Sequence, residues 1–217
     1  MTLRDEESAR VYVASQCDAA GFTRLERLVA MLVDENGRQN LIARNSVGQI
    51  WQRHIADSVQ LLRFVSRETG VWLDIGSGAG FPGLVLAAIR PDWPFRLVEL
   101  RKRRVEWLKA CIAELGLNHC AVLGERLERI ESFPAAFISA RAFAPLGDLL
   151  ALSTRFSTDE TLWLLPKGQG AALELQALPT HARAMFHVEP SLTDGHAGII
   201  VGHWAAQARA KRIRTQS

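Results

Sequence analysis

The sequence predicts an α/β fold in which a helical extension precedes a mostly parallel, doubly wound sheet. From Val71 onward, short apolar runs alternate with amphipathic segments, which is the pattern of repeated strand–helix units. Residues 1–68 contain no proline and carry apolar residues at helical spacing. The glycine-rich stretch LDIGSGAGFPG, residues 73–83, joins the first of the apolar runs to the segment after it.

Composition limits the class of protein. With 217 residues, 48% of them hydrophobic, the chain can bury the core of one domain with an appendage. Its longest apolar runs, such as GLVLAAI and TLWLLP, are too short for a membrane span, and its first residues show no secretory pattern. The 3 cysteines form no CxxC pair, and the histidines are scattered. We therefore expect a cytoplasmic monomer with no disulfide framework, no metal and no membrane partner.

The N-terminal extension, residues 1–68, should be helical and pack on the main domain. Trp51, Ile55, Val59 and Leu62 follow the spacing of one helix face. Breaks between helices are expected at Gly21, around Asn36-Gly37 and near Gly48.

The main domain, residues 69–208, should contain the sheet, and a basic tail follows over 209–217. The expected strands are 71–75, 96–100, 120–125, 137–140, 161–166, 185–190 and 198–205, and the expected helices are 82–89, 104–116, 146–153 and 171–178. Only a loop around Thr193-Asp194-Gly195 separates the last two strands. Such a short connection predicts an antiparallel pair at the sheet edge.

The glycine loop predicts a ligand site, because doubly wound sheets bind ligands beyond the carboxyl ends of their strands. Gly76-x-Gly78-x-Gly80 follows a strand-end aspartate, as in methyltransferases that use S-adenosylmethionine. Gly78-x-Gly80-x-x-Gly83 also fits the dinucleotide fingerprint. Both kinds of site use an acid at the end of the second strand for the ribose hydroxyls, and Glu99 supplies one. The spacing alone leaves the two ligands open.

Basic residues gather at two places in a chain whose formal net charge is +3 and whose pI is about 9.0. One block, Arg101 to Arg104, opens the helix after the second strand, where cations oppose the helix dipole. This cost indicates another use, such as contact with an RNA backbone, although a solvated helix end also explains the block. The tail carries the second cluster: Arg209, Lys211, Arg212 and Arg214.

Several separated stretches resemble one family over roughly residues 25 to 170. They are Asn40-Leu41, the run RHIxDS at 53–58, LDIGSGAGFPGLVLA, a strand-end acid followed by KRRVEWL, ARAFAPL and LPKG. In order and spacing they resemble the bacterial 16S rRNA guanine-N7 methyltransferases, called RsmG or GidB. The resemblance implies a class I, Rossmann-like methyltransferase fold with S-adenosyl-L-methionine as cofactor. It implies 16S rRNA or the 30S subunit as partner and N7 of one guanine in a decoding-region hairpin loop as target.

The resemblance also implies site residues. The expected cofactor contacts are Asp74, Gly76, Ser77, Gly78, Gly80, Phe81, Glu99, Leu127, Glu128 and Arg141. Charge and position along the chain, rather than the resemblance, give the expected RNA contacts, which are His54, Arg101, Lys102, Arg103, Arg104 and Lys167. Arg141 and Lys167 are the expected catalytic residues. Ala136 departs from the family pattern, which often has aspartate there.

Guanine N7 carries a lone pair and no proton, so its methylation needs alignment with the methyl donor rather than a general base. Each of these side chains could instead have a purely structural role. Arg141 could form an ion pair with Asp74 or Glu99, and Lys167 could be a lysine in a turn. His54 and Asp57 could belong to a network that docks the extension on the sheet. Arg53 and Asp57 have the spacing of an intrahelical ion pair. The aromatic residues Phe81 and Phe143 could line the base pocket or belong to the core.

Two other functions remain open at this stage. The alternative glycine spacing fits a nicotinamide-dependent oxidoreductase, but no Tyr-x-x-x-Lys proton donor is present, and the single tyrosine, Tyr12, lies outside the sheet domain. A non-catalytic RNA-binding module on the same fold is the second alternative. The intact glycine loop and Glu99 argue against it.

Overall fold

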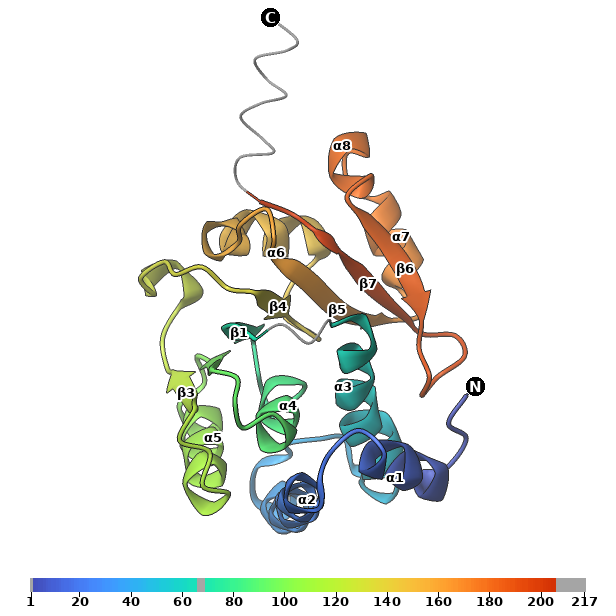
Figure 1. Ribbon diagram of the computed structural model, residues 1–217, viewed down its shortest axis with the longest axis vertical. Helices are drawn as coiled ribbons and strands as arrows, with labels where there is room; N and C mark the ends of the chain where they lie inside the picture. Colours follow the sequence, from blue (N-terminus) through green and yellow to red (C-terminus); the bar gives the residue numbers. More distant parts are fainter. Residues whose placement is uncertain (1, 66–68, 206–217) are drawn as a thin grey trace, which may run out of the picture.

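The structure, a computed structural model, describes residues 2–65 and 69–205 (Figure 1). The predicted basic tail lies outside the described residues, as do 66–68 at the expected end of the extension and 206–208 at the expected end of the main domain. Within the described ranges, no helix combines the length and the apolar character that a membrane span requires.

A sheet of 7 strands forms the centre of the molecule, in the order β3-β2-β1-β4-β5-β7-β6. Its strands are β1 Trp72–Ile75, β2 Phe95–Val98, β3 Cys120–Leu123, β4 Phe137–Ser139, β5 Leu162–Gly168, β6 Phe186–Pro190 and β7 Gly198–His203. All of them fall within or beside the predicted segments. The first five pair in parallel, with Asp74 of β1 beside Leu97 of β2 and Ser139 of β4.

The last two strands form the predicted antiparallel pair. β7 runs antiparallel to both β5 and β6, so the antiparallel strand lies one position inside the edge and β6 is the outermost strand. The 191–197 connection between β6 and β7 therefore returns to the end of the sheet where β5 terminates.

Helices cover both faces of the sheet (Figure 1). One layer contains α4 Gly83–Ile89 and α5 Lys102–Glu114 and is backed by the extension; the other contains α6 Leu146–Ser153, α7 Ala171–Gln176 and α8 Thr180–Arg183. Short 3-10 segments, η4 Leu127–Arg129 and η5 Thr154–Phe156, complete the main domain. Successive strand residues point to opposite layers, so Trp72 packs in one apolar cluster and Leu73 in the other.

The extension folds against α4 and α5. Its elements are α1 Glu6–Ala14, α2 Ala19–Gln39, η1 Arg44–Gln49, the π-helical turn η2 Trp51–Ala56, α3 Asp57–Val59 and η3 Gln60–Phe64. The predicted apolar face is buried, with Ile55 and Val59 fully inaccessible. One edge of the extension, η2 and α3, approaches the end of β5 and β7 (Figure 1).

The predicted breaks at Gly21 and Asn36-Gly37 are wrong, because α2 runs through both positions. The helix begins at the Asp18 cap, whose side chain accepts from the Gly21 N–H at 2.6 Å, and it ends at Asn40, whose φ is 46°. A glycine costs a helix only about 1 kcal/mol. Helix α4 approaches this position closely, since a Cβ at Gly21 would lie 3.4 Å from Ile89, and α2 continues through it.

Candidate active site

The loop between β1 and α4 lies at the carboxyl edge of the sheet and requires glycine at three positions. Gly76, Gly78 and Gly80 have φ values of 72°, 56° and 109°. A Cβ at Gly76 would lie 2.9 Å from the Phe143 ring, and one at Gly80 would lie 2.8 Å from Leu84. The loop therefore combines left-handed backbone with close packing, which a larger residue would disturb.

Asp74 anchors this loop from below. Its Oδ1 accepts from the Ser139 hydroxyl at 2.7 Å, and its Oδ2 accepts from the Gly83 N–H at 3.1 Å. Burial raises the pKa of the Asp74 carboxyl group, while the hydrogen bonds lower it. The side chain is fully buried and does not line the adjoining cavity. The sequence assigned Asp74 to the cofactor; in the structure its carboxylate lies behind the cavity wall and holds the loop through Ser139 and Gly83.

The position of Asp74 bears on the choice between the two ligands. A dinucleotide would place its pyrophosphate on free N–H groups at the start of α4. Here the first of these, on Gly83, is taken by an acidic side chain. The geometry thus disfavours a pyrophosphate at this loop.

Glu99 joins the loop to the start of α5. Its Oε1 accepts from the N–H groups of Leu100 and Arg101, each at 2.8 Å, and its Oε2 accepts from the Gly78 N–H at 3.0 Å. A carboxylate offers about four acceptor positions. Three of these positions accept backbone hydrogen bonds, so one acceptor position remains, on Oε2. It can accept from one ribose hydroxyl, whereas the sequence suggested that Glu99 accepts from both hydroxyls.

A cavity of about 570 Å³ opens above these residues. Of the ten predicted cofactor contacts, eight line it: Gly76, Ser77, Gly78, Phe81, Glu99, Leu127, Glu128 and Arg141. Gly80 lies in the loop but not on the cavity wall, like Asp74. The wall also includes Leu41, Ala79, Val98, Leu100, Glu125, Arg126, Ala142 and Phe143, which the sequence did not assign to the cofactor. The apolar side chains of Leu41, Val98 and Leu127 and the carboxylate of Glu99 offer an adenosine an apolar surface and an acceptor for a ribose hydroxyl.

The basic block has two different environments. Arg101 and Arg104 line the cavity. Arg103 and Arg104 donate to the Arg38 and Asn40 carbonyl oxygens at 3.0 and 2.8 Å, so they bind the C-terminal end of α2. Lys102 is exposed and pairs with Glu106 at 4.0 Å. Docking of the extension thus explains part of the positive charge that the sequence left unexplained.

Arg141 closes the cavity at the end opposite Glu99. Its guanidinium lies 5.0 Å above the Phe81 ring, and its Nη1 donates to His54 Nδ1 at 3.1 Å. Asp57 Oδ2 is 3.9 Å from the same nitrogen. Burial lowers the pKa of the Arg141 guanidinium, and the nearby carboxyl groups of Asp57 and Asp74 raise it. The ion pair that the sequence suggested with Asp74 or Glu99 is instead made with Asp57.

His54 has a defined tautomer. Since arginine can only donate, Nδ1 accepts, and the proton lies on Nε2, which donates to the Ser46 hydroxyl at 3.1 Å. The ring stacks on Phe81 with 4.9 Å between centroids. Burial, followed by the charges of Arg141 and Arg53, lowers the pKa of His54 to about 3. His54 is therefore a neutral, buried support for Arg141, and its place beneath the cavity does not favour the predicted RNA contact.

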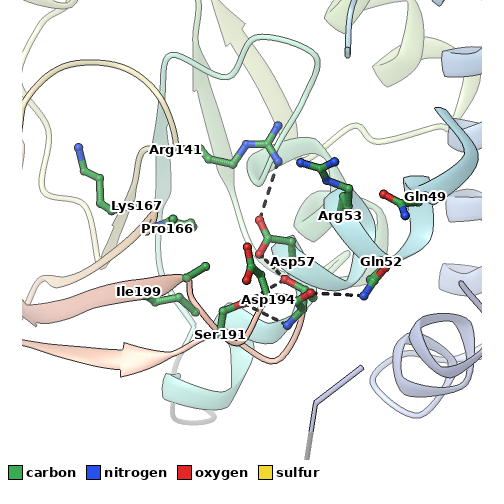
Figure 2. A pocket seen from close by; sticks show the side chains of 14 residues that line it. Gln49, Gln52, Arg53, Asp57, Arg141, Pro166, Lys167, Ser191, Asp194 and Ile199 are labelled. Atoms are coloured by element: carbon green, nitrogen blue, oxygen red, sulfur yellow. Dashed lines mark hydrogen bonds and ion pairs between the residues drawn. The ribbon is translucent and has the colours of Figure 1, made fainter. Parts of the chain in front are cut away.

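Lys167 is also engaged within the protein. Its ammonium pairs with Glu174 of α7 at 2.9 Å and donates to the Ala144 carbonyl oxygen at 2.9 Å. The ion pair holds the end of β5 to α7, and the hydrogen bond holds it to the loop that follows Arg141. In Figure 2 the ammonium points away from the pocket that its stem lines.

A second cavity, of about 400 Å³, adjoins the first between the extension and the β5–β7 edge (Figure 2). Its residues are Gln49, Gln52, Arg53, Asp57, Arg141, Pro166, Lys167, Gly168, Ser191, Thr193, Asp194, Ala197, Gly198 and Ile199. Asp57 Oδ1 accepts from the Gln60 amide at 2.8 Å and from the Thr193 hydroxyl at 2.9 Å. Within residues 2–65 and 69–205, the predicted Arg53–Asp57 ion pair does not form. The π-helical turn at 51–56 changes the helical spacing, and Asp57 turns toward Thr193 instead.

Sequence reasoning noted the 193–195 segment only as a connection and missed its role in this second cavity. Asp57 and Thr193 are 136 positions apart, so no local sequence pattern predicts their contact. Among the described residues, no cluster of three or more His, Cys, Asp or Glu has the arrangement of a metal site.

Comparison with known proteins identifies the family. The family described as GidB, rRNA small subunit methyltransferase G, matches residues 22–198. The chain belongs to this family. The ribosomal RNA small subunit methyltransferase G of Erythrobacter litoralis is 58% identical over 202 residues, which are 93% of this chain and 98% of that protein. The protein of the same name from Novosphingobium aromaticivorans is 54% identical over 211 residues, covering 95% and 91% of the two chains.

The fold is shared with solved methyltransferase-like structures. A mutant of MtNAS in complex with S-adenosylmethionine has a TM-score of 0.53 at 17% identity and covers 92% of this chain and 84% of that one. The predicted class I, Rossmann-like fold is confirmed. The protein is an S-adenosylmethionine-dependent methyltransferase. The walls of the larger cavity fit that cofactor through the free Oε2 position of Glu99 and the apolar faces of Leu127 and Val98.

Proposed function

We propose that this enzyme transfers the methyl group of S-adenosylmethionine to N7 of one guanine in the decoding-region hairpin of 16S rRNA. Family membership supports an rRNA substrate of the small subunit, as the relatives' names state. The single structural observation that carries the proposal is the pair of adjoining cavities separated by Arg141. One has walls that suit an adenosyl group, and the other lies beside it with Arg141 between them.

The cofactor residues divide along the larger cavity. Glu99 accepts one ribose hydroxyl at its remaining Oε2 position, and Leu127 and Glu128 flank the adenine. Gly76 and Arg141 would hold its methionine part. The cofactor would supply an electrophilic methyl group on a sulfonium.

The protein's own contribution is alignment. N7 of guanine has an in-plane lone pair and no proton, so no side chain is needed as a general base. Arg141, fixed by His54 and Asp57, is placed to donate to the guanine O6 and to hold the base edge toward the methyl group. Its charge opposes a purine that becomes cationic. The carboxyl group of Asp57 offsets this effect.

RNA contacts follow from the exposed groups around the cavities. Lys102 and Arg101 are exposed cations at the rim, and Leu100 and Phe143 are exposed apolar side chains beside them. A single-stranded loop could stack on such side chains while its phosphates contact the cations. Lys167 remains a weaker proposal, because Glu174 already neutralises it.

The test is transfer of a labelled methyl group from S-adenosylmethionine to 30S subunits that lack the modification, with free 16S rRNA in parallel. We expect label in the rRNA and inhibition by S-adenosylhomocysteine. A folded protein that binds S-adenosylhomocysteine but labels neither substrate would contradict the proposal. A melting-temperature rise with NAD instead of S-adenosylhomocysteine would favour the oxidoreductase alternative.

A further inference from the structure

The second cavity adjoins the cofactor cavity at Arg141. It shares only Arg141 with the lining of the cofactor cavity. Glu99 follows β2 and Arg141 follows β4, on opposite sides of β1, so a cofactor whose adenosine is held by Glu99 and Leu127 would have its methionine and methyl group near Arg141. A base held in the second cavity would therefore approach the methyl group from the side of Arg141.

Asp57 presents one carboxylate oxygen to this cavity. Its Oδ1 is fixed by hydrogen bonds from Gln60 and Thr193 at 2.8 and 2.9 Å. Its Oδ2 lies 3.9 Å from Arg141 Nη1, which is beyond hydrogen-bond distance. Within the described residues no hydrogen bond is made to Oδ2, so its acceptor positions remain available in a side chain that is oriented through Oδ1 and lines the cavity.

Guanine differs from the other bases in what it offers to such an oxygen. Its Watson–Crick edge has two adjacent donors, the N1–H and the N2 amino group, whereas adenine has one donor and one acceptor, and cytosine and uracil each have one donor and two acceptors. Guanine N7 lies on the neighbouring Hoogsteen edge, beyond O6. A carboxylate that holds the Watson–Crick edge would turn N7 away from itself, toward Arg141 and the cofactor.

The side walls suit a flat base. Pro166 and Ile199 lie on one side of the cavity, and Arg53 lies across from them (Figure 2). No ion pair or hydrogen bond to the Arg53 guanidinium is formed by residues 2–65 and 69–205, so its planar face remains for stacking. Bases of single-stranded RNA stack on arginine as well as on aromatic rings.

We propose that the second cavity holds the target guanine and that Asp57 selects it by accepting hydrogen bonds from N1–H and N2–H. This inference rests on the proposed function and adds to it the residue that chooses the base. The competing role for Asp57, as a mere counter-ion of Arg141, would affect the methylation rate but not the choice of base.

The experiment measures base selectivity in the full-length protein saturated with S-adenosylhomocysteine. Guanosine, inosine and adenosine monophosphates are titrated and followed by ligand-observed NMR. Inosine keeps N1–H, O6 and N7 but lacks the amino group, so we expect it to bind about tenfold more weakly than guanosine. Asp57→Asn should remove that difference. Equal binding of the guanosine and adenosine nucleotides, a difference that survives in Asp57→Asn, or no binding at millimolar concentration would each overturn the proposal.

Controls separate folding from selectivity. Asp92→Asn changes an exposed aspartate before β2, at the other end of the strands, and should leave selectivity and methylation unchanged. Thr193→Val keeps the carboxylate but removes one donor that orients it, so it should reduce the guanosine-to-inosine ratio partway. Unchanged affinity for S-adenosylhomocysteine shows that each variant is folded. If Asp57→Asn does not fold, an unreduced ratio in Thr193→Val would overturn the proposal.

Methylation of 30S subunits distinguishes the two ways of failing. If the wild-type enzyme labels guanine N7 and Asp57→Asn does so with unchanged kcat/KM, only the inference about Asp57 fails. If wild type binds the guanosine nucleotide selectively but labels no rRNA, the proposed function fails while the guanine pocket stands. The inference predicts that Asp57→Asn lowers kcat/KM at least about tenfold without changing cofactor affinity.

Discussion

Replacing Glu99 with glutamine exchanges a single oxygen for an amino group and should weaken both the fold and cofactor binding. In the wild type the carboxylate accepts from the N–H groups of Gly78, Leu100 and Arg101. However the amide turns, its NH₂ group faces at least one of these donors. A hydrogen bond to a charged group contributes about 1.5–3 kcal/mol, so we expect the free energy of unfolding to fall by about 2–3 kcal/mol.

In a chain of this size that loss corresponds to a melting temperature lower by about 5–10 °C. Urea denaturation measures the stability, and calorimetric titration with S-adenosylhomocysteine measures cofactor affinity, which should drop because the ribose loses its acceptor. Glu106→Gln, on the exposed side of α5, is the matched control. Unchanged stability in Glu99→Gln would refute the loop anchor, and unchanged affinity would refute the contact with ribose.

Two further predictions concern His54 and the glycines. Because the pKa of His54 falls from 6.5 to about 3 on folding, its neutral form contributes stability that is fully present above pH 6.5 and is lost as pH falls toward about 3. NMR of the imidazole should show no titration between pH 5 and 8, and a midpoint near 6.5 would contradict its buried place. Gly83→Ala should cost about 1–3 kcal/mol, since the new Cβ would lie 2.4 Å from Leu97 and 2.6 Å from Asp74. Gly37→Ala, in α2 with no atom within 4 Å, should instead stabilise by about 0.5–1 kcal/mol, and urea midpoints that failed to separate the two would contradict this packing.

The strands could be predicted because each one is a short apolar run between turn residues. Trp72 and Leu73 show why the runs are continuous rather than alternating: both faces of the sheet are covered, so neighbouring residues are both buried. The course of α2 could not be read in this way. The low cost of Gly21 and Gly37 in a helix is outweighed by contacts with α4 and by the caps at Asp18 and Asn40.

At the site, the sequence was enough to predict which residue types are present, but not their hydrogen-bond and ion-pair partners. The glycine spacing and Glu99 suffice to expect an adenosine-binding edge. Nothing local shows that Asp74 bonds inward to Gly83, or that Lys167 meets Glu174. The structural role of the basic block could not be predicted for the same reason. Arg103 and Arg104 bond to the end of helix α2, at residues 65 and 64 positions earlier in the chain.

The most direct test of the proposed function is the location of the methyl group on the rRNA. Subunits lacking the modification are incubated with the enzyme and S-adenosylmethionine, and the extracted 16S rRNA is cleaved chemically at 7-methylguanine. The account predicts a single new cleavage, in the decoding-region hairpin, that is absent without enzyme. Incorporation of methyl without cleavage at any guanine would contradict N7 as the acceptor atom, and cleavage at another guanine would contradict the proposed target.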